Sequence, residues 1–317
     1  MNTKDLALYL AILFGFALPC VVFSLAKSKI PHQDLQTEPT LFVAEEKRFV
    51  RLKRDNGTVT EIEEAEYVLG VVLQEMPVSF EEEALKAQAV VARTYTRRKQ
   101  YVAPKHEDAD VCTNPACCQG YCPPESYGEK GLVVSDVEKV RDAVNETGNL
   151  VLTYEGELID ATYFSCSGGM TEDAAAVWGA DVPYLRATES PGEEGATYYT
   201  ETVQLSLGEF QSALGLNLSG AAEKWIKNIV YTTGGGVDSI EIGGQVFSGT
   251  EVRKRLSLRS TCFKITIVGD TVTVTTKGYG HRVGMSQYGA DAMAVGGSDF
   301  KEILAHYYKD TQLEEVG

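Results

Sequence analysis

The stretch from Gly278 to Gln287 constrains the fold more than any other part of the chain. It reads Gly-Tyr-Gly-His-Arg-Val-Gly-Met-Ser-Gln, so three of its residues are glycines. Glycine adopts backbone angles that other residues avoid, and it lets other groups approach the backbone closely. We therefore expect a tightly bent segment that displays polar groups such as His281. A glycine-rich connection that closes a sheet is the plainer interpretation of the same spacing.

The second constraint lies near the amino terminus, where residues 6–26 contain no charged side chain. A helix of about 20 apolar residues crosses the roughly 30 Å of hydrocarbon in a bilayer. A cleaved signal peptide is the alternative, although its apolar region is usually only about 7 to 15 residues long. We expect a retained transmembrane anchor at 6–26, preceded by residues 1–5 and followed by a linker at 27–46 without periodicity.

The net charge of the chain narrows the class of ligand. The sequence has 45 acidic and 29 basic residues, which give a formal net charge of −16. An acidic surface repels nucleic acid and anionic membrane surfaces, so we expect neither as a specific ligand. A neutral glycan remains compatible with this charge, because a groove can differ locally from the rest of the surface.

The sequence predicts three hairpins, each built around a two-residue turn. The turns are Asn56-Gly57, Glu155-Gly156 and Gly269-Asp270, and alternating or β-rich segments flank all of them. The predicted strand pairs are residues 49–53 with 59–62, 150–154 with 158–163, and 263–268 with 272–275.

Helical patterns lie between these hairpins. A helix at 63–75 should end before Pro77, and Ser79 with Glu82 forms a capping box for a second helix that runs to about residue 98. Ser135 and Glu138 cap a third, short helix that ends near residue 148. Residues 202–257 read as a smaller α/β insertion. The expected class is α+β, with mixed helices and short antiparallel hairpins around a substrate groove.

The glycine-rich run is the last of several motifs that follow one another along the chain. Together they resemble the stage II sporulation protein D family over roughly residues 40–313. Arg282 departs from the family pattern, which usually has glycine there. A long cation beside His281 would either narrow the groove or contact substrate. The other motifs are residues 71–77, 83–95, 163–169 with Glu172 and 177–179, and 258–261 with Phe263.

The resemblance implies cleavage of peptidoglycan glycan strands or assistance to a cell-wall amidase, with Glu75 as the catalytic residue. The position of Glu75 fits this role, because it ends an apolar helical stretch just before Met76 and Pro77. Apolar surroundings and the negative end of a helix dipole both disfavour the charged carboxylate. A carboxyl group that stays protonated near neutral pH is what a general acid requires. A solvated glutamate at a helix end is the alternative.

A single prominent acid distinguishes two classes of glycan-cleaving enzyme. Ordinary glycoside hydrolases need two carboxylates, one to protonate the leaving oxygen and one to activate water or attack carbon. A lytic transglycosylase needs one, because the muramyl C6 hydroxyl of the substrate is the nucleophile and the product is a 1,6-anhydromuramyl end. Glu172 would then be auxiliary.

The resemblance also implies a set of groove residues. Gln88, Arg93 and Tyr95 are expected to support the groove, with Arg93 orienting Glu75 or the substrate. Tyr163 and Trp178 are candidates for stacking on sugar faces, although core packing is the commoner use of such side chains. His281 is expected to position the loop or contact substrate, or to be a hydrogen-bonded structural histidine. The predicted substrate-binding residues are Arg93, Tyr163, Ser165, Ser167, Gly168, Gly169, His281 and Gln287.

Cysteines form a further cluster, with Cys112, Cys117, Cys118 and Cys122 crowded together after His106. The family pattern favours Cys112 and Cys118 over Cys117. His106, Cys112 and Cys118 would suit a tetrahedral zinc, whose fourth ligand would be water, another cysteine or substrate. Disulfides are the alternative in an oxidising compartment, and their pairing does not follow from sequence.

These observations predict a membrane-anchored lytic transglycosylase that acts on glycan strands stripped of stem peptides during engulfment of the forespore. By resemblance, residues 1–5 are cytoplasmic and the catalytic domain at 47–313 lies between the mother cell and forespore membranes. The implied partners are an amidase and a membrane protein, the stage II sporulation proteins P and M. The alternatives are a non-catalytic cell-wall module that enhances an amidase and a zinc hydrolase that uses the cysteine loop.

Overall fold

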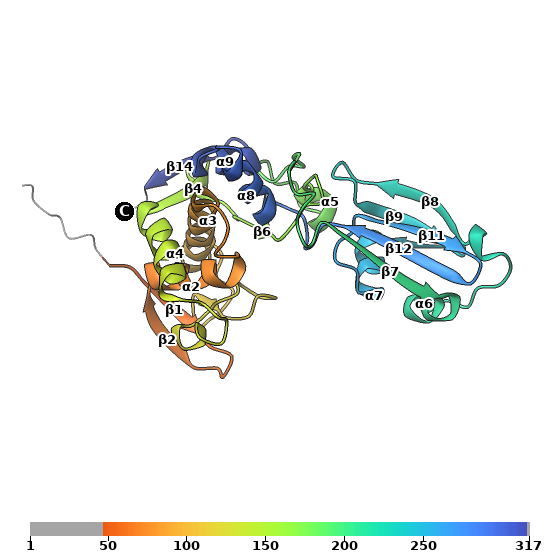
Figure 1. Ribbon diagram of the computed structural model, residues 1–317, viewed down its shortest axis with the longest axis horizontal. Helices are drawn as coiled ribbons and strands as arrows, with labels where there is room; N and C mark the ends of the chain where they lie inside the picture. Colours follow the sequence, from red (N-terminus) through yellow and green to blue (C-terminus); the bar gives the residue numbers. More distant parts are fainter. Residues whose placement is uncertain (1–46, 316–317) are drawn as a thin grey trace, which may run out of the picture. The chain divides into compact units, whose positions relative to one another are not determined.

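The computed structural model describes residues 47–315 of the chain (Figure 1). The predicted anchor at 6–26 and its flanking segments 1–5 and 27–46 lie outside the described residues. Among the helices of residues 47–315, none has the length and apolar character needed to span a bilayer.

A long buried helix forms the centre of the first hydrophobic core. This helix, α3 (Glu82–Tyr101), is buried on almost every face, which is typical of a helix surrounded by other elements. It contacts α2, α4, α8, α9 and strand β4 (Figure 1). The remaining helices of this part are α2 (Glu64–Glu75), α4 (Val134–Glu146), α5 (Ala174–Trp178), α8 (Gln287–Val295), α9 (Phe300–Tyr307) and the 3₁₀ turn η1 (Pro124–Ser126).

Three small sheets border this first core. One has the order β2-β1-β3, a second β14-β4-β5, and the third pairs β6 with β13 in parallel. The β6–β13 pair brings the 163–169 motif beside the glycine-rich run. The strands are β1 (Phe49–Lys53), β2 (Val59–Glu63), β3 (Val111–Cys112), β4 (Leu150–Tyr154), β5 (Glu157–Leu158), β6 (Tyr163–Phe164), β13 (Met285–Ser286) and β14 (Gln312–Glu315).

A second hydrophobic core contains residues such as Phe210, Ile240 and Phe247. It lies among two antiparallel sheets, of orders β10-β9-β8 and β11-β12-β7, and two short helices. The elements are β7 (Thr200–Ser206), α6 (Leu207–Leu214), η2 (Ala222–Lys224), β8 (Ile226–Tyr231), β9 (Val237–Ile242), β10 (Gln245–Ser248), α7 (Gly249–Arg255), β11 (Phe263–Val268) and β12 (Thr271–Lys277).

The structure confirms the α+β class and the first and third predicted hairpins. The second hairpin is shorter than predicted, because β5 ends at Leu158 and Tyr163 pairs with Met285 in another sheet. The third hairpin shares its core with the 202–257 segment, since buried residues of this core include both Phe210 and Val274.

Both predicted helix caps are wrong. Helix α3 begins at Glu82 with Glu81 at the N-cap position, and the Glu81 side chain makes no capping hydrogen bond. In α4 the N-cap is Val133, whose backbone N–H donates to the Asp136 carboxylate at 3.0 Å. Ser135 therefore lies inside the helix that it was expected to open.

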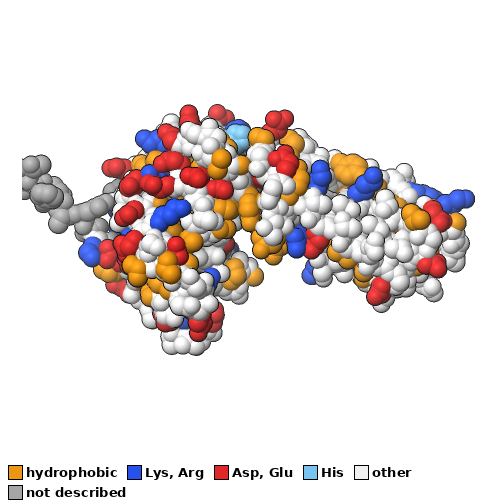
Figure 2. Space-filling view, in the orientation of Figure 1, with side chains coloured by type: hydrophobic (Ala, Val, Ile, Leu, Met, Phe, Trp, Pro, Cys, Tyr) orange, Lys and Arg blue, Asp and Glu red, His pale blue; other side chains and the backbone are white. Residues whose placement is uncertain are grey.

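On the face drawn in Figure 2, many acidic side chains lie over the helices of the first core.

Candidate functional site

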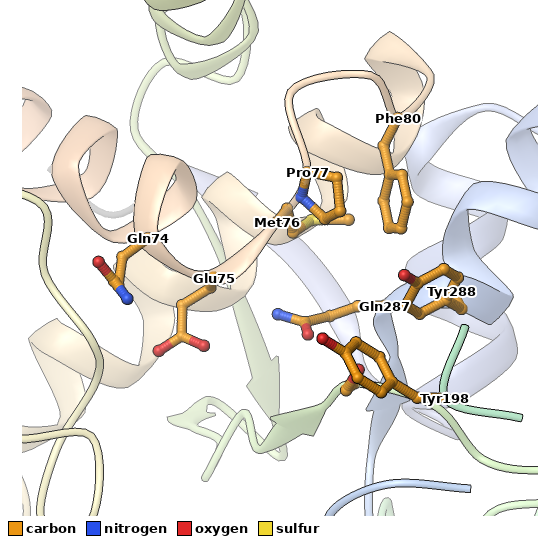
Figure 3. Close-up of a pocket in the computed structure, with 9 residues that line it drawn as sticks. Gln74, Glu75, Met76, Pro77, Phe80, Tyr198, Gln287 and Tyr288 are labelled. Atoms are coloured by element: carbon orange, nitrogen blue, oxygen red, sulfur yellow. The ribbon is translucent and has the colours of Figure 1, made fainter. Parts of the chain in front are cut away.

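Glu75 is the last residue of α2 and lies at the wall of a cavity. The helix ends there because Met76 takes an extended conformation and Pro77 follows, which has no backbone N–H to continue the helix. The side chain of Glu75 is half-buried. We call the space of about 300 Å³ beside it the Glu75 cavity (Figure 3), and it is lined by Gln74, Glu75, Met76, Pro77, Phe80, Ser165, Tyr198, Gln287 and Tyr288.

The surroundings of Glu75 raise the pKa of its carboxyl group. Burial is the largest cause, and it outweighs hydrogen bonds from the Gly120 backbone and the Tyr163 hydroxyl and the charge of Lys130, all of which lower the pKa. The Gly120 N–H donates to Glu75 Oε1 at 2.6 Å. A Cβ at position 120 would lie 2.8 Å from the same oxygen, so a larger residue there would displace the Glu75 side chain. The site thus favours a protonated carboxyl group while it holds donors ready for the carboxylate.

This raised pKa predicts a pH-dependent stability. The folded chain binds the Glu75 proton more tightly than the unfolded chain, whose pKa is near the ordinary value of 4.5. The resulting stabilisation is fully present below the unfolded pKa and is lost as pH rises through the folded pKa. We expect the Tm of the wild type to fall relative to that of Glu75→Gln as pH rises above about 4.5. Thermal unfolding of both proteins across this range tests it, and parallel pH profiles would contradict it.

Polar amides and aromatic rings complete the Glu75 cavity. Figure 3 shows the Gln287 amide extending across the cavity toward the side on which Glu75 lies. Gln287 Nε2 donates to Gln88 Oε1 at 3.4 Å, so Gln88 positions Gln287 from below the surface. Tyr288 packs edge-on against Phe80, with ring centroids 5.0 Å apart. Aromatic rings beside amide groups are suited to the apolar faces and the hydroxyl groups of a sugar.

The predicted glycan-contacting loop is only partly exposed to the cavity. Ser165 lines the cavity, whereas Ser167 is fully buried and its hydroxyl donates to Glu193 Oε2 at 2.7 Å. The Gly168 N–H donates to the same oxygen at 2.9 Å. The Gly169 N–H donates to Ser167 Oγ at 2.9 Å. The predicted direct contact of Ser167 with substrate is therefore corrected, because its hydroxyl is used internally.

Arg93 is also placed differently from the prediction. It is 2% exposed, and its guanidinium donates to Thr147 Oγ1 and to the carbonyls of Val144 and Leu150. Its Nε lies 3.7 Å from Glu64 Oε2. Arg93 therefore joins α3 to the end of α4 and the start of β4, and it does not line the Glu75 cavity. The expected role of Arg93 in orienting Glu75 is wrong, because its guanidinium binds buried groups of α4 and β4 instead.

His281 has the contacts of a structural histidine, which was one of its two predicted roles. Its Nδ1 accepts from the Val283 N–H at 3.1 Å, and its ring packs against Trp178 and Phe164. Burial, followed by the positive charge of Arg253, lowers the pKa of His281 to about 4. The imidazole is thus neutral at ordinary pH and fixes the loop. Of these two aromatic residues, Trp178 is the more accessible to solvent, because it is 45% exposed.

The structure gathers four candidate metal ligands in the loop after α3. Ligand atoms of His106, Cys112, Cys117 and Cys118 all lie within 4.8 Å of one another. His106 Nε2 is 3.4 Å from Cys118 Sγ and 3.8 Å from Cys117 Sγ. Three sulfurs and one imidazole fit the ligand set of a closed, structural zinc site. The structure therefore adds Cys117 to the predicted set of His106, Cys112 and Cys118.

Arg282 and Glu172 form a buried ion pair, and each is only 1% exposed. Arg282 Nη1 lies 3.1 Å from Glu172 Oε1, and the guanidinium also donates to the carbonyls of Ser167, Met170 and Gly234. Neither residue lines the Glu75 cavity. Arg282 therefore cannot contact a substrate in that cavity, which was one of its predicted roles. Glu172 does not lie beside Glu75, so the predicted role of an auxiliary acid is also wrong.

Sequence reasoning missed Gly120, Tyr198 and Glu193. Gly120 lies two residues after Cys118, so a glycine between the proposed zinc ligands and Tyr121 was an available signal. Tyr198 lies in an irregular segment that carries no periodic pattern. Glu193 was one acid among many, and its role depends on serines at positions 167, 190 and 286 that meet only in the fold.

Comparisons with known proteins point in one direction. A family model described as "Stage II sporulation protein" matches residues 53–154. Stage II sporulation protein D of Bacillus amyloliquefaciens is 37% identical over 83% of this chain and 78% of its own length. The protein of the same name from Bacillus subtilis (strain 168) is 39% identical over 82% of this chain and 77% of its own length. A B. subtilis protein named amidase enhancer is 32% identical over 77% of this chain and 40% of its own length.

Proposed function

Because the chain belongs to the stage II sporulation protein D family, we propose that it is a peptidoglycan lytic transglycosylase with Glu75 as its acid and base. The main support is the composition of the Glu75 cavity. Among the described residues that line it, Glu75 is the sole carboxylic acid. A hydrolase of the ordinary two-carboxylate kind would need a second acid on the other side of the scissile bond.

The proposed reaction uses the two protonation states of Glu75 in turn. The protonated carboxyl group first donates its proton to the glycosidic oxygen as the C1–O bond breaks. The carboxylate then takes the proton of the muramyl C6 hydroxyl, whose oxygen bonds to C1 and closes the 1,6-anhydro ring. The Gly120 N–H, 2.6 Å from Glu75 Oε1, stabilises the carboxylate between these steps. No water is consumed, and Glu75 ends protonated as it began.

A non-catalytic role is the second candidate. The relative named amidase enhancer favours it, since this chain is 32% identical to that protein. In that case the Glu75 cavity would bind glycan and present it to an amidase without cleaving it. Mass spectrometry of stem-peptide-free glycan strands after incubation with the full chain separates these functions. Anhydromuramyl ends support the transglycosylase, reducing ends indicate hydrolysis, and unchanged strands that bind the protein support the enhancer.

The proposed setting is forespore engulfment. We place the catalytic part outside the cell membrane, in the space between the mother cell and forespore membranes, held by the uncharged segment at 6–26. Its partners would be a peptidoglycan amidase and a membrane protein, corresponding to the stage II sporulation proteins P and M. The name of the family supports a role in sporulation. Loss of the partner amidase should leave the glycan without stripped strands for this enzyme.

We further propose that His106, Cys112, Cys117 and Cys118 bind one structural zinc. Tyr95 supports the loop from α3, because its hydroxyl donates to the Cys117 carbonyl at 3.4 Å. The loop continues into Gly120, which contacts Glu75. Four protein ligands leave no open position on the metal, so this arrangement favours a structural zinc over a zinc hydrolase. The metal would order the loop, and the chemistry would remain with Glu75.

Cys118→Ser is expected to lose the zinc and to lower glycan cleavage, because Gly120 is then no longer held against Glu75. Metal binding contributes folding free energy when the ligands meet only in the folded chain. Elemental analysis should find about one zinc per wild-type chain and little in the variant. Cys262→Ser is the matched control, since Cys262 lies outside the cluster. Thiol counting that shows a disulfide among these cysteines, with no metal, would overturn the proposal.

A further inference from the structure

Arg253 is a half-buried cation without an acidic partner. It lies in the last turn of α7, and its Nε donates to the Leu258 carbonyl at 3.3 Å. Among the described residues it forms no ion pair, whereas its neighbours Arg255 and Arg259 are each paired with a glutamate. Burial lowers the pKa of the Arg253 guanidinium, because the protein does not replace the lost hydration of the charge.

The two terminal nitrogens of Arg253 can be reached from solvent. Neither Nη1 nor Nη2 has a hydrogen-bond partner within residues 47–315, and neither is enclosed by protein atoms. A guanidinium presents its N–H groups in a planar fork, which matches the two oxygens of a carboxylate. Since only the Nε–H of Arg253 is used inside the protein, the end of its fork remains for an anion from outside.

The end of α7 lies against the glycine-rich run. The Gly280 N–H donates to the Arg259 carbonyl at 3.1 Å, and the Arg259 guanidinium lies 5.9 Å from the centre of the Tyr279 ring. Arg253 is close enough to Tyr279 and His281 for its charge to act on both side chains. Tyr279 is 43% exposed. An exposed aromatic ring and an uncompensated cation therefore meet at this surface.

This surface continues from the Glu75 cavity. Tyr198 lines the cavity, and its ring centroid is 5.2 Å from that of Tyr279. The Arg259 guanidinium lies 5.3 Å from the centre of the Tyr198 ring, so it joins the two tyrosines from one side. Aromatic rings suit the apolar faces of sugars. A glycan strand whose cleaved bond lies beside Glu75 extends beyond the cavity, and we expect its next rings to lie along these tyrosines.

The proposed substrate carries the anion that Arg253 lacks. In an intact strand the lactyl carboxyl group of each muramyl ring is joined to the stem peptide as an amide, which has no charge. Removal of the peptide frees a carboxylate on the same ring. Carboxylates form short, charge-assisted and often bidentate hydrogen bonds with arginine. The net charge of −16 makes the rest of the chain a poor surface for such an anion.

We propose that Arg253 binds the free lactyl carboxylate of a muramyl ring that lies beside Tyr279, and that it thereby selects stripped strands over strands that retain stem peptides. This inference rests on the proposed function, because it names a specificity-determining residue for the same glycan. The ring lies outside the Glu75 cavity, so Arg253 acts in binding and takes no part in breaking the glycosidic bond. Removal of the stem peptide would create the group that is recognised.

Binding of two chemically matched glycans tests the role of Arg253. One is stripped glycan strands, and the other is the same strands with their lactyl carboxylates converted to carboxamides, which have nearly the same size and no charge. The full chain carries Glu75→Gln, which prevents cleavage. Arg253→Gln in this chain should lower the ratio of the two affinities, carboxylate over carboxamide, about tenfold, as expected for the loss of a charged hydrogen bond. Affinity for the carboxamide strands should not change, whereas misfolding would weaken binding of both.

Two further variants complete the test. Lys254→Gln removes the same charge from the exposed neighbour of Arg253 in α7 and should leave the ratio unchanged. Arg253→Lys keeps the charge without the planar fork and should retain part of the preference. An unchanged ratio in Arg253→Gln would overturn the inference. An equal fall in Lys254→Gln would also overturn it, in favour of a diffuse attraction. A ratio that depends on Arg253, in a protein whose wild type yields no anhydromuramyl ends, would contradict the proposed function alone.

Discussion

Glu75→Gln is expected to reduce cleavage of peptidoglycan glycan strands by at least about 10² to 10⁴, the contribution of general acid catalysis. The substitution preserves the volume of the side chain and one carbonyl oxygen that can accept from the Gly120 N–H, which now contacts Glu75 Oε1 at 2.6 Å. The amide has no acidic proton to give to the glycosidic oxygen. It also cannot take the proton of the C6 hydroxyl, so both steps of the proposed reaction fail together.

The fold of this variant should remain intact. Glu75 makes no ion pair among the described residues, and neutralising it removes a charge that burial disfavours. Its Tm should therefore equal or exceed that of the wild type at neutral pH. Glu61→Gln is the matched control, because Glu61 is an exposed residue of β2 and lies outside the cavity. Normal cleavage by Glu75→Gln would exclude Glu75 as the acid.

The resemblance to the family pointed to Glu75, and the sequence features that fit this residue to the role of an acid are local. The apolar stretch of α2, the end of the helix and Pro77 are all within a few residues. The raised pKa expected from these neighbours is the direction that the structure gives. The first and third hairpins were predictable for the same reason, since in each one two strands that are adjacent in sequence flank a short turn that contains Asn56-Gly57 or Gly269-Asp270.

Arg93 shows why other roles could not be predicted. The groups that bind its guanidinium belong to Val144, Thr147 and Leu150, which lie more than 50 residues further along the chain. A helical pattern shows that position 93 faces one side of α3, but it does not show which element packs there. The motif therefore suggested a substrate contact where the fold has a structural cation.

Ser167 and Cys117 illustrate the same limit at shorter range. Ser167 precedes two glycines, which is the composition of a ligand-binding loop. Its hydroxyl nevertheless donates to the Glu193 carboxylate. Nothing in the sequence marks Glu193 as its partner. Cys117 precedes Cys118 directly, and only the turn of the loop decides whether neighbouring sulfurs face the same point. Both outcomes depend on contacts between segments, which spacing does not encode.

Arg282→Gly is expected to destabilise the fold by about 2 to 4 kcal/mol, although the family usually has glycine at this position. Arg282 has φ +65°, a left-handed conformation that glycine adopts freely, so the substitution recovers about 1 kcal/mol of backbone strain. Against this, removing one partner of a buried ion pair costs about 3 to 5 kcal/mol. Glu172, which is 1% exposed, would be left in the interior without its counterion.

A double-mutant cycle separates these effects. Glu172→Gln in the Arg282→Gly background removes the uncompensated charge, so we expect the double variant to be more stable than Arg282→Gly alone. Urea unfolding followed by the fluorescence of Trp178 and Trp225 measures each free energy. Arg186→Ala is the control for an exposed pair, because Arg186 and Asp181 are 41% and 73% exposed, and it should cost no more than about 1 kcal/mol. If Arg282→Gly were as stable as the wild type, the buried pair would contribute nothing to stability.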